Sequence, residues 1–183
     1  MTYDAKEAAR YLGVKTPTDE LIEKIHEAAK AAEGLCPSYA CACFDASATA
    51  DGVFLQGTDV LLRGNLAKKT FAGCKKILVV LATLGLKSDL LLRRTFALSA
   101  EKAVILDAVY TDMLEKYLDE TEKTLSATYG ALTTRISCGY GDLPLATQKD
   151  LFALTEGERL GVKINECCML VPNKSVIALL GVR

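Results

Sequence analysis

The first third of the chain changes from a helical to a strand-like pattern of apolar positions. In residues 19–35, apolar side chains such as Leu21 and Ile25 recur at spacings of three and four, which predicts a helix. Residues 39–46, YACACFDA, alternate in the period of two that is typical of a strand, and two short apolar segments follow across glycine-containing turns. The pattern predicts an N-terminal helical segment, residues 1–35, and then a strand meander.

The middle of the chain contains its most strongly apolar segment and its longest helical pattern. Residues 75–82, KKILVVLA, form an uninterrupted apolar run that predicts a central strand, and residues 65–72 predict a short helix before it. Residues 99–125 contain neither glycine nor proline and have apolar positions at helical spacing. We therefore expect the longest helix there, with Ser99 as its N-cap.

The last third of the chain combines strand, loop and helix signals. Residues 132–137 predict a strand, residues 138–144 a loop, and residues 146–160 a helix that ends at a glycine. The two final apolar segments, residues 162–171 and 175–182, predict a β-hairpin whose turn contains the Pro-Asn-Lys sequence between them.

Helices and meandering strands are mixed along the chain instead of alternating strictly. This order favours an α+β fold, with a twisted, mainly antiparallel sheet and flanking helices, over a doubly wound parallel sheet. The 183 residues, half of them apolar, are enough to bury one core, and no linker or repeat divides them. We expect one domain, residues 1–183, made of the helical segment 1–35 and an α+β core, residues 36–183.

Charge and hydropathy limit the partners that the chain can have. Its 22 basic and 23 acidic residues give a net charge of −1, so no positive field would attract nucleic acid. The longest apolar run, residues 77–86, is about half of the roughly 20 residues that a membrane helix needs. The N-terminal residues lack the apolar core of a signal peptide. We expect a cytoplasmic protein that binds neither nucleic acid nor membranes.

Cysteine and histidine give little indication of a metal site. The seven cysteines are an odd set without the spacing of a disulfide scaffold, and reduced thiols are expected. The spacings CxC and CC do not match the usual zinc-ligand patterns. His26 is the single histidine, lies in the first long predicted helix and has no second histidine to join it.

The densest group of conformationally special residues lies in residues 135–145, RISCGYGDLPL. Two glycines and a proline predict a tightly specified loop, because glycine permits positive φ and proline fixes its own φ. Arg135 offers planar donors suited to a carboxylate, and Tyr140 offers an aromatic face, so an amino acid joined to a purine would match both. An alternative is structural: Arg135 pairs with a neighbouring carboxylate and Tyr140 fills the core.

A second candidate is the acidic face of the longest predicted helix. Asp112, Glu115 and Asp119 lie at spacings of three and four and should share one side of the helix. Such a side could hold an ammonium or sulfonium group. A solvated helix face has the same pattern, and both interpretations stay open.

Cys138 supplies a third candidate. It lies in the loop beside Arg135, and a neighbouring cation can lower the pKa of a thiol, which would suit a thiol enzyme or an oxidoreductase. A small buried cysteine without any chemistry gives the same sequence signal.

Three segments of the last two thirds of the chain carry a resemblance to a known family. RISCGYGDLPLATQ, LFALTEGERLGVKINECCMLVPNKSV and ILVVLATLG are similar to the activation domain of cobalamin-dependent methionine synthase and to its stand-alone short relatives. The most specific element is the Arg-x-x-x-Gly-Tyr signature, followed in order by GVKINE and VPNKSV. The resemblance implies that family's α+β activation-domain fold.

The resemblance also implies a function. The chain would be an S-adenosylmethionine-binding reactivation subunit that supports reductive remethylation of cob(II)alamin in methionine synthesis. Arg135 would bind the ligand's carboxylate, while Glu115, or Asp112 as a fallback, would face the ligand from the long helix. The loop around the ligand's adenosine would consist of Ser137, Gly139 and Tyr140.

The same resemblance implies partners, because the chain lacks the Asp-x-His-x-x-Gly motif that ligates cobalamin in related proteins. A corrinoid protein or a truncated cobalamin-dependent methionine synthase would carry the cobalamin, and a flavodoxin-like donor would supply the electron. The chain would then be one component of a methyltransferase activity. One aspartate of the family has no counterpart that the sequence reveals, so the alternative is a non-catalytic module that docks on a corrinoid protein without binding S-adenosylmethionine.

Overall fold

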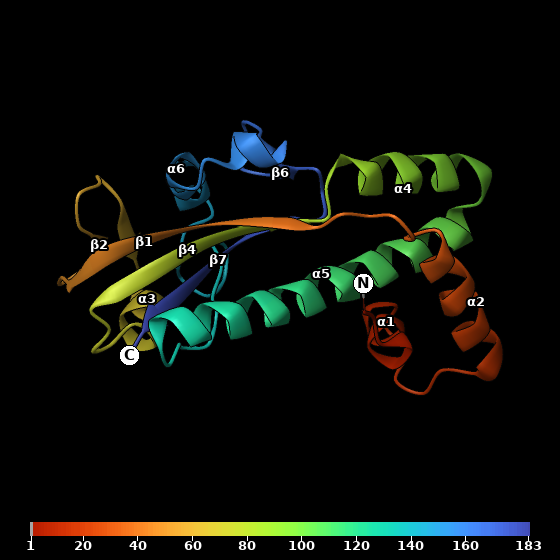
Figure 1. Ribbon diagram of the computed structural model, residues 1–183, viewed down its shortest axis with the longest axis horizontal. Helices are drawn as coiled ribbons and strands as arrows, with labels where there is room; N and C mark the ends of the chain where they lie inside the picture. Colours follow the sequence, from red (N-terminus) through yellow and green to blue (C-terminus); the bar gives the residue numbers. More distant parts are fainter. Residues whose placement is uncertain (1) are drawn as a thin grey trace.

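A five-stranded sheet forms the middle of the computed structural model, which describes residues 2–183 (Figure 1). Every pair of neighbouring strands in it is antiparallel. In spatial order the strands are β3 (Leu61–Arg63), β2 (Gly52–Leu55), β1 (Ser38–Ala48), β4 (Lys76–Thr83) and β7 (Ser175–Val182). All of β4 except its first residue is buried, as expected for the central apolar strand. The predicted α+β class with an antiparallel sheet is confirmed.

The longest helix, α5 (Ala100–Tyr129), runs along one face of the sheet (Figure 1). The Ser99 hydroxyl accepts a hydrogen bond from the N–H of Lys102, so the predicted N-cap is confirmed. Three other helices pack against α5, two of them from the predicted N-terminal helical segment. They are α1 (Ala5–Tyr11), α2 (Asp19–Lys30) and α4 (Leu86–Leu98).

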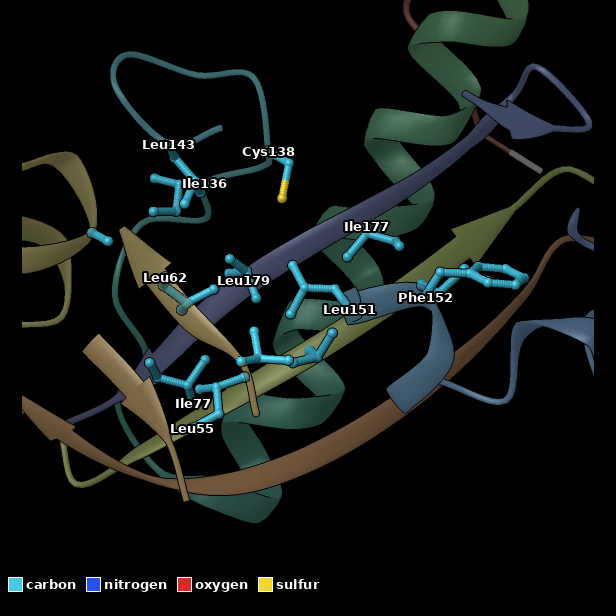
Figure 2. Packing of buried hydrophobic residues seen from close by; sticks show 14 of the residues in the cluster. Leu55, Leu62, Ile77, Ile136, Cys138, Leu143, Leu151, Phe152, Ile177 and Leu179 are labelled. Carbon is cyan, nitrogen blue, oxygen red and sulfur yellow. The ribbon is translucent and has the colours of Figure 1, made fainter. Parts of the chain in front are cut away.

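The two faces of β4 contribute to different parts of the core, because alternate side chains of a strand point to opposite sides. Ile77 and Val79 pack on one face with loop and C-terminal residues, whereas Leu78 and Val80 pack on the other with Leu125 of α5. On the face opposite α5 lies α6 (Thr147–Leu154). Figure 2 shows Leu151 and Phe152 of that helix over the sheet.

Two predictions for the last third of the chain are wrong in their extent. Residues 132–137 do not form a strand and meet β7 only at two isolated bridges, Leu132–Val182 and Ile136–Leu179. The predicted helix 146–160 is interrupted, and its second part is the 3₁₀ helix η1 (Gly157–Leu160). The chain turns at Glu156, which has a positive φ of 51°, and this turn brings Gly157 against Phe152.

The predicted C-terminal hairpin is also wrong. β7 pairs along its whole length with β4, while β5 (Lys163–Ile164) pairs with β6 (Leu170–Val171) in a separate two-stranded sheet. The continuous apolar sequence of β7 explains the difference, since such a strand is stable only where both of its faces are covered. The short helix predicted at 65–72 is confirmed as α3 (Asn65–Thr70). In the part of the chain that the structure describes, no helix combines the length and hydropathy needed to span a membrane.

Candidate functional site

Arg135 lies at the edge of the sheet, where the chain passes from the α5 side to the opposite side. The neighbouring residue Ile136 exchanges backbone hydrogen bonds with Leu179 of β7 and buries its side chain in the core. Because successive side chains of an extended segment point in opposite directions, Arg135 is directed toward α5. The alternation therefore places the apolar side chain of Ile136 in the core and the charged side chain of Arg135 against α5.

Three carboxylates of α5 surround the Arg135 guanidinium. Its Nη2 donates to Glu115 at 2.6 Å, and its Nη1 donates to Asp119 at 2.8 Å and also to Glu122. Positions 115, 119 and 122 are four and three residues apart, so they share one face of the helix. The predicted common side is confirmed for Glu115 and Asp119, and so is the interpretation in which Arg135 pairs with neighbouring carboxylates.

The ion cluster has an excess of negative charge. One guanidinium faces three carboxylates, so the cluster contains two more acidic groups than basic ones. Partial burial by itself would lower the pKa of Arg135, but the hydrogen bonds to Glu122, Asp119 and Glu115 outweigh it and raise that pKa above its usual range. Arg135 is therefore positively charged at neutral pH.

Asp112 points away from this cluster. Its side chain is buried, and its carboxylate accepts a hydrogen bond of 2.6 Å from the backbone N–H of Asp4 at the start of α1. Burial raises the pKa of Asp112. Of the two acids expected to face a ligand, Glu115 is therefore the one that the structure brings to Arg135.

Tyr140 stands on the surface of the loop. Its side chain is 61% exposed, so the expectation that it fills the core is wrong. The loop is closed by hydrogen bonds from the Tyr140 N–H to the Ser137 carbonyl and from the Gly139 N–H to the Leu143 carbonyl. Gly139 has a φ of +88°, a conformation that side-chain-bearing residues rarely adopt. The loop thus presents an aromatic ring on a rigid support.

Comparison with known proteins supports the fold assignment. No protein-family model and no curated protein sequence matches the chain. A solved structure described as the MetH reactivation domain bound to AdoHcy matches with a TM-score of 0.72 and 16% sequence identity. The match covers 98% of this chain and 74% of that one. The chain has the fold of that reactivation domain. The fold implied by the sequence resemblance is therefore confirmed.

Within this reactivation-domain fold, Asp142 has a structural role. Its carboxylate accepts hydrogen bonds from the backbone N–H groups of Asn65 (2.6 Å) and Leu66 (2.9 Å), at the first turn of α3. The bonds from Leu66 and Asn65 lower the pKa of Asp142. Gly64 precedes that turn, and a Cβ there would lie only 2.6 Å from the Asp142 carboxylate. The charge of Asp142 thus holds the loop to α3.

Cys138 does not suit thiol chemistry. Its side chain is 6% exposed and lies in the core together with Ile136 and Leu143 (Figure 2). Burial raises the pKa of its thiol to about 12, so the reactive thiolate is scarce near neutral pH. Arg135, which would have favoured the thiolate, is directed toward the α5 carboxylates instead. The thiol-enzyme interpretation is contradicted.

Glu122 was not among the acids expected from the sequence. It continues the series of Glu115 and Asp119 by a further three residues, so the same spacing rule would have found it. Its side chain is only 27% exposed, the least of the three carboxylates that meet Arg135.

Proposed function

We propose that the chain is a reactivation subunit that binds S-adenosylmethionine and supports reductive remethylation of cob(II)alamin on a partner protein in methionine synthesis. One observation carries the proposal: 98% of the chain superposes on a reactivation domain that was solved with AdoHcy bound. The 2.6 Å contact between Arg135 and Glu115 adds to it, since the arginine of the Arg-x-x-x-Gly-Tyr signature meets its expected partner on the long helix.

The residues proposed to hold the ligand fit the chemistry of S-adenosylmethionine. Its amino-acid end has a carboxylate, which suits the guanidinium of Arg135, and an ammonium, which suits the carboxylate of Glu115. Tyr140 offers an exposed aromatic face for the adenine, and Gly139, which has no side chain, would let the backbone approach the ribose closely, with Ser137 in the same loop. When bound, the ligand would supply a methyl group to the corrinoid of the partner.

The corrinoid itself is assigned to a partner. The single histidine, His26, lies on α2 and its Nδ1 is 2.6 Å from the Tyr3 hydroxyl, outside any Asp-x-His-x-x-Gly context. A corrinoid protein or a truncated cobalamin-dependent methionine synthase would therefore dock over the loop, and a flavodoxin-like donor would supply the electron. In this scheme the residues of this chain hold and orient the methyl donor.

Calorimetric titration of the full chain with S-adenosylmethionine tests the proposal. Arg135→Ala should weaken binding by about tenfold or more, because a charge-assisted, two-pronged contact is lost. Arg135→Lys keeps the charge without the planar donors and should recover only part of the affinity. Arg159→Ala is the matched control, because Arg159 is exposed and pairs with its own neighbour Glu156.

Folding of each variant is checked by circular dichroism and thermal unfolding before titration. Absence of heat from the wild-type chain at millimolar S-adenosylmethionine would overturn the proposal. Equal affinity in Arg135→Ala and the wild-type chain would remove Arg135 from the site.

A second candidate function has one observation in its favour. Both Nη atoms of Arg135 are already engaged by carboxylates, which is the state expected of a chain that keeps the fold without the ligand. Such a chain would be a module that docks on a corrinoid protein. Pull-down of a corrinoid partner by a chain that shows no calorimetric response to S-adenosylmethionine supports this candidate, and dependence of the pull-down on S-adenosylmethionine contradicts it.

A further inference from the structure

The engagement of Arg135 creates a problem for any ligand that presents a carboxylate. The guanidinium already meets three carboxylates, so acidic groups outnumber basic ones in the cluster by two. A fourth carboxylate approaching the same donors would be repelled by this excess. Both hydrogens of Nη1 are taken by Asp119 and Glu122, so a ligand can reach Nη1 only if at least one of these carboxylates leaves.

We propose that Asp119 and Glu122 compete with S-adenosylmethionine for Arg135, so that the ligand binds by exchanging counter-ions within the cluster. The inference rests on the proposed function. The ligand's carboxylate takes the place of Asp119 and Glu122 at Nη1, while Glu115 turns to the ligand's ammonium. Asp119 and Glu122 thereby set the affinity of the site, a role that the sequence resemblance does not give them.

The charge balance of the exchange favours one class of ligand. A zwitterionic amino-acid end brings one negative and one positive group, and each of them finds an opposite charge when it enters between Arg135 and Glu115. A nucleoside without that end brings neither, and it gains nothing from opening the cluster. The cluster should therefore select adenosine derivatives with an intact amino-acid end.

The surroundings of the cluster permit the exchange without unfolding. The Arg135 side chain is 25% exposed, and those of Asp119 and Glu122 are 48% and 27% exposed, so the released carboxylates can be hydrated. The backbone next to Arg135 is fixed, because Ile136 exchanges hydrogen bonds with Leu179. Only side chains have to move.

The test compares the wild-type chain with Asp119→Asn/Glu122→Gln by calorimetry. S-adenosylmethionine should bind the double variant about fivefold more tightly, the size expected from removing competing part-exposed ion pairs. Binding of 5′-methylthioadenosine, which has no amino-acid end, should be unchanged. Glu120→Gln is the control variant, since Glu120 lies on the same helix, is exposed and meets Thr2 instead of Arg135.

The outcomes separate this inference from the function on which it rests. If the wild-type chain and all variants fail to bind S-adenosylmethionine, the proposed function falls. If the wild-type chain binds and the double variant binds equally or more weakly, the proposed function stands and counter-ion competition is refuted. Should the double variant not fold, Asp119→Asn and Glu122→Gln are titrated singly, since each leaves two carboxylates on Arg135.

Discussion

The backbone N–H of Asn65 donates a 2.6 Å hydrogen bond to the carboxylate of Asp142, a residue 77 positions later in the chain. This contact, with its companion from Leu66, holds the loop that carries Tyr140 against the start of α3. The position of the candidate site thus depends on a helix that takes no direct part in it. The contribution of these two hydrogen bonds to stability can be measured without a ligand.

Asp142→Ala should lower the thermal stability of the chain, because two backbone N–H groups lose their acceptor. The pKa of Asp142 is lowered in the folded chain. The Asp142 carboxylate therefore stabilises the fold above the ordinary aspartate pKa, and this stabilisation is lost as the pH falls through the lowered pKa. Thermal unfolding from pH 7 down to about pH 3 should show the wild-type and variant curves converging. Asp59→Ala, at an exposed carboxylate, serves as the control, and a constant difference across this range would contradict the assignment.

Asp112→Leu should destabilise the chain by about 1–3 kcal/mol, since the N–H of Asp4 then lacks its part-buried acceptor. Asp112→Asn keeps an acceptor and should be tolerated. Burial raises the pKa of Asp112, so the wild-type chain loses stability as the pH rises through that raised pKa and the carboxyl group ionises. Asparagine does not ionise, so the Asn variant does not have this loss. In denaturant unfolding, the free energy of unfolding of Asp112→Asn relative to that of the wild-type chain should therefore be higher at pH 7 than at about pH 4. The reverse trend would contradict the burial argument.

Cys138 should resist alkylation in the folded chain even at about pH 9, because burial both shields the thiol and raises its pKa to about 12. Exposed Cys36 and Cys167 should react with iodoacetamide under the same conditions. Peptide mass spectrometry measures the labelling, with a sample in guanidinium chloride as the fully reactive reference. Labelling of Cys138 as fast as that of Cys167 would show the thiol to be accessible.

Gly157→Ala should cost about 1–3 kcal/mol through overpacking. A Cβ at this position would lie 2.5 Å from the Phe152 ring and 3.1 Å from a methyl group of Leu81. Glu158→Ala, at an exposed neighbouring position, is expected to be near neutral. Phe152→Leu in the Gly157→Ala background should recover part of the loss, and a double-mutant cycle from urea unfolding measures the coupling. Additive effects would indicate that the two residues do not meet.

Local pattern was sufficient to predict most elements of this fold. The continuous apolar run of β4 and the glycine-free sequence of α5 each indicate one kind of element, and both were predicted. The pairing of β7 was not predictable in this way, since its apolar sequence suits a hairpin with the preceding segment as well as a place beside β4. Long-range burial decided between them. The helix α4 gave no clear signal because apolar residues such as Leu90 and Phe96 are exposed.

For the candidate site, the sequence predicts which residues take part better than it predicts which residues contact one another. The motif and the chemistry of Arg135 and Glu115 predict that both face one ligand, and in the structure their side chains are 2.6 Å apart. The sequence does not predict that three carboxylates bind Arg135 together. This contact depends on which side chains of the edge segment point toward α5, and the sequence pattern does not give that direction. The roles of Ser137, Gly139 and Tyr140 toward a ligand stay predictions.

The position of β7 has a consequence for the order in which the molecule is assembled. β7 lies between β4 and the edge segment that carries Arg135, and it bonds to both. During synthesis, β1 to β4 can pair as soon as they leave the ribosome, whereas residues 131–136 lack the strand to which they bond until residues 175–182 emerge. The segment that carries Arg135, although made earlier, is therefore fixed to the sheet only when this late strand is in place.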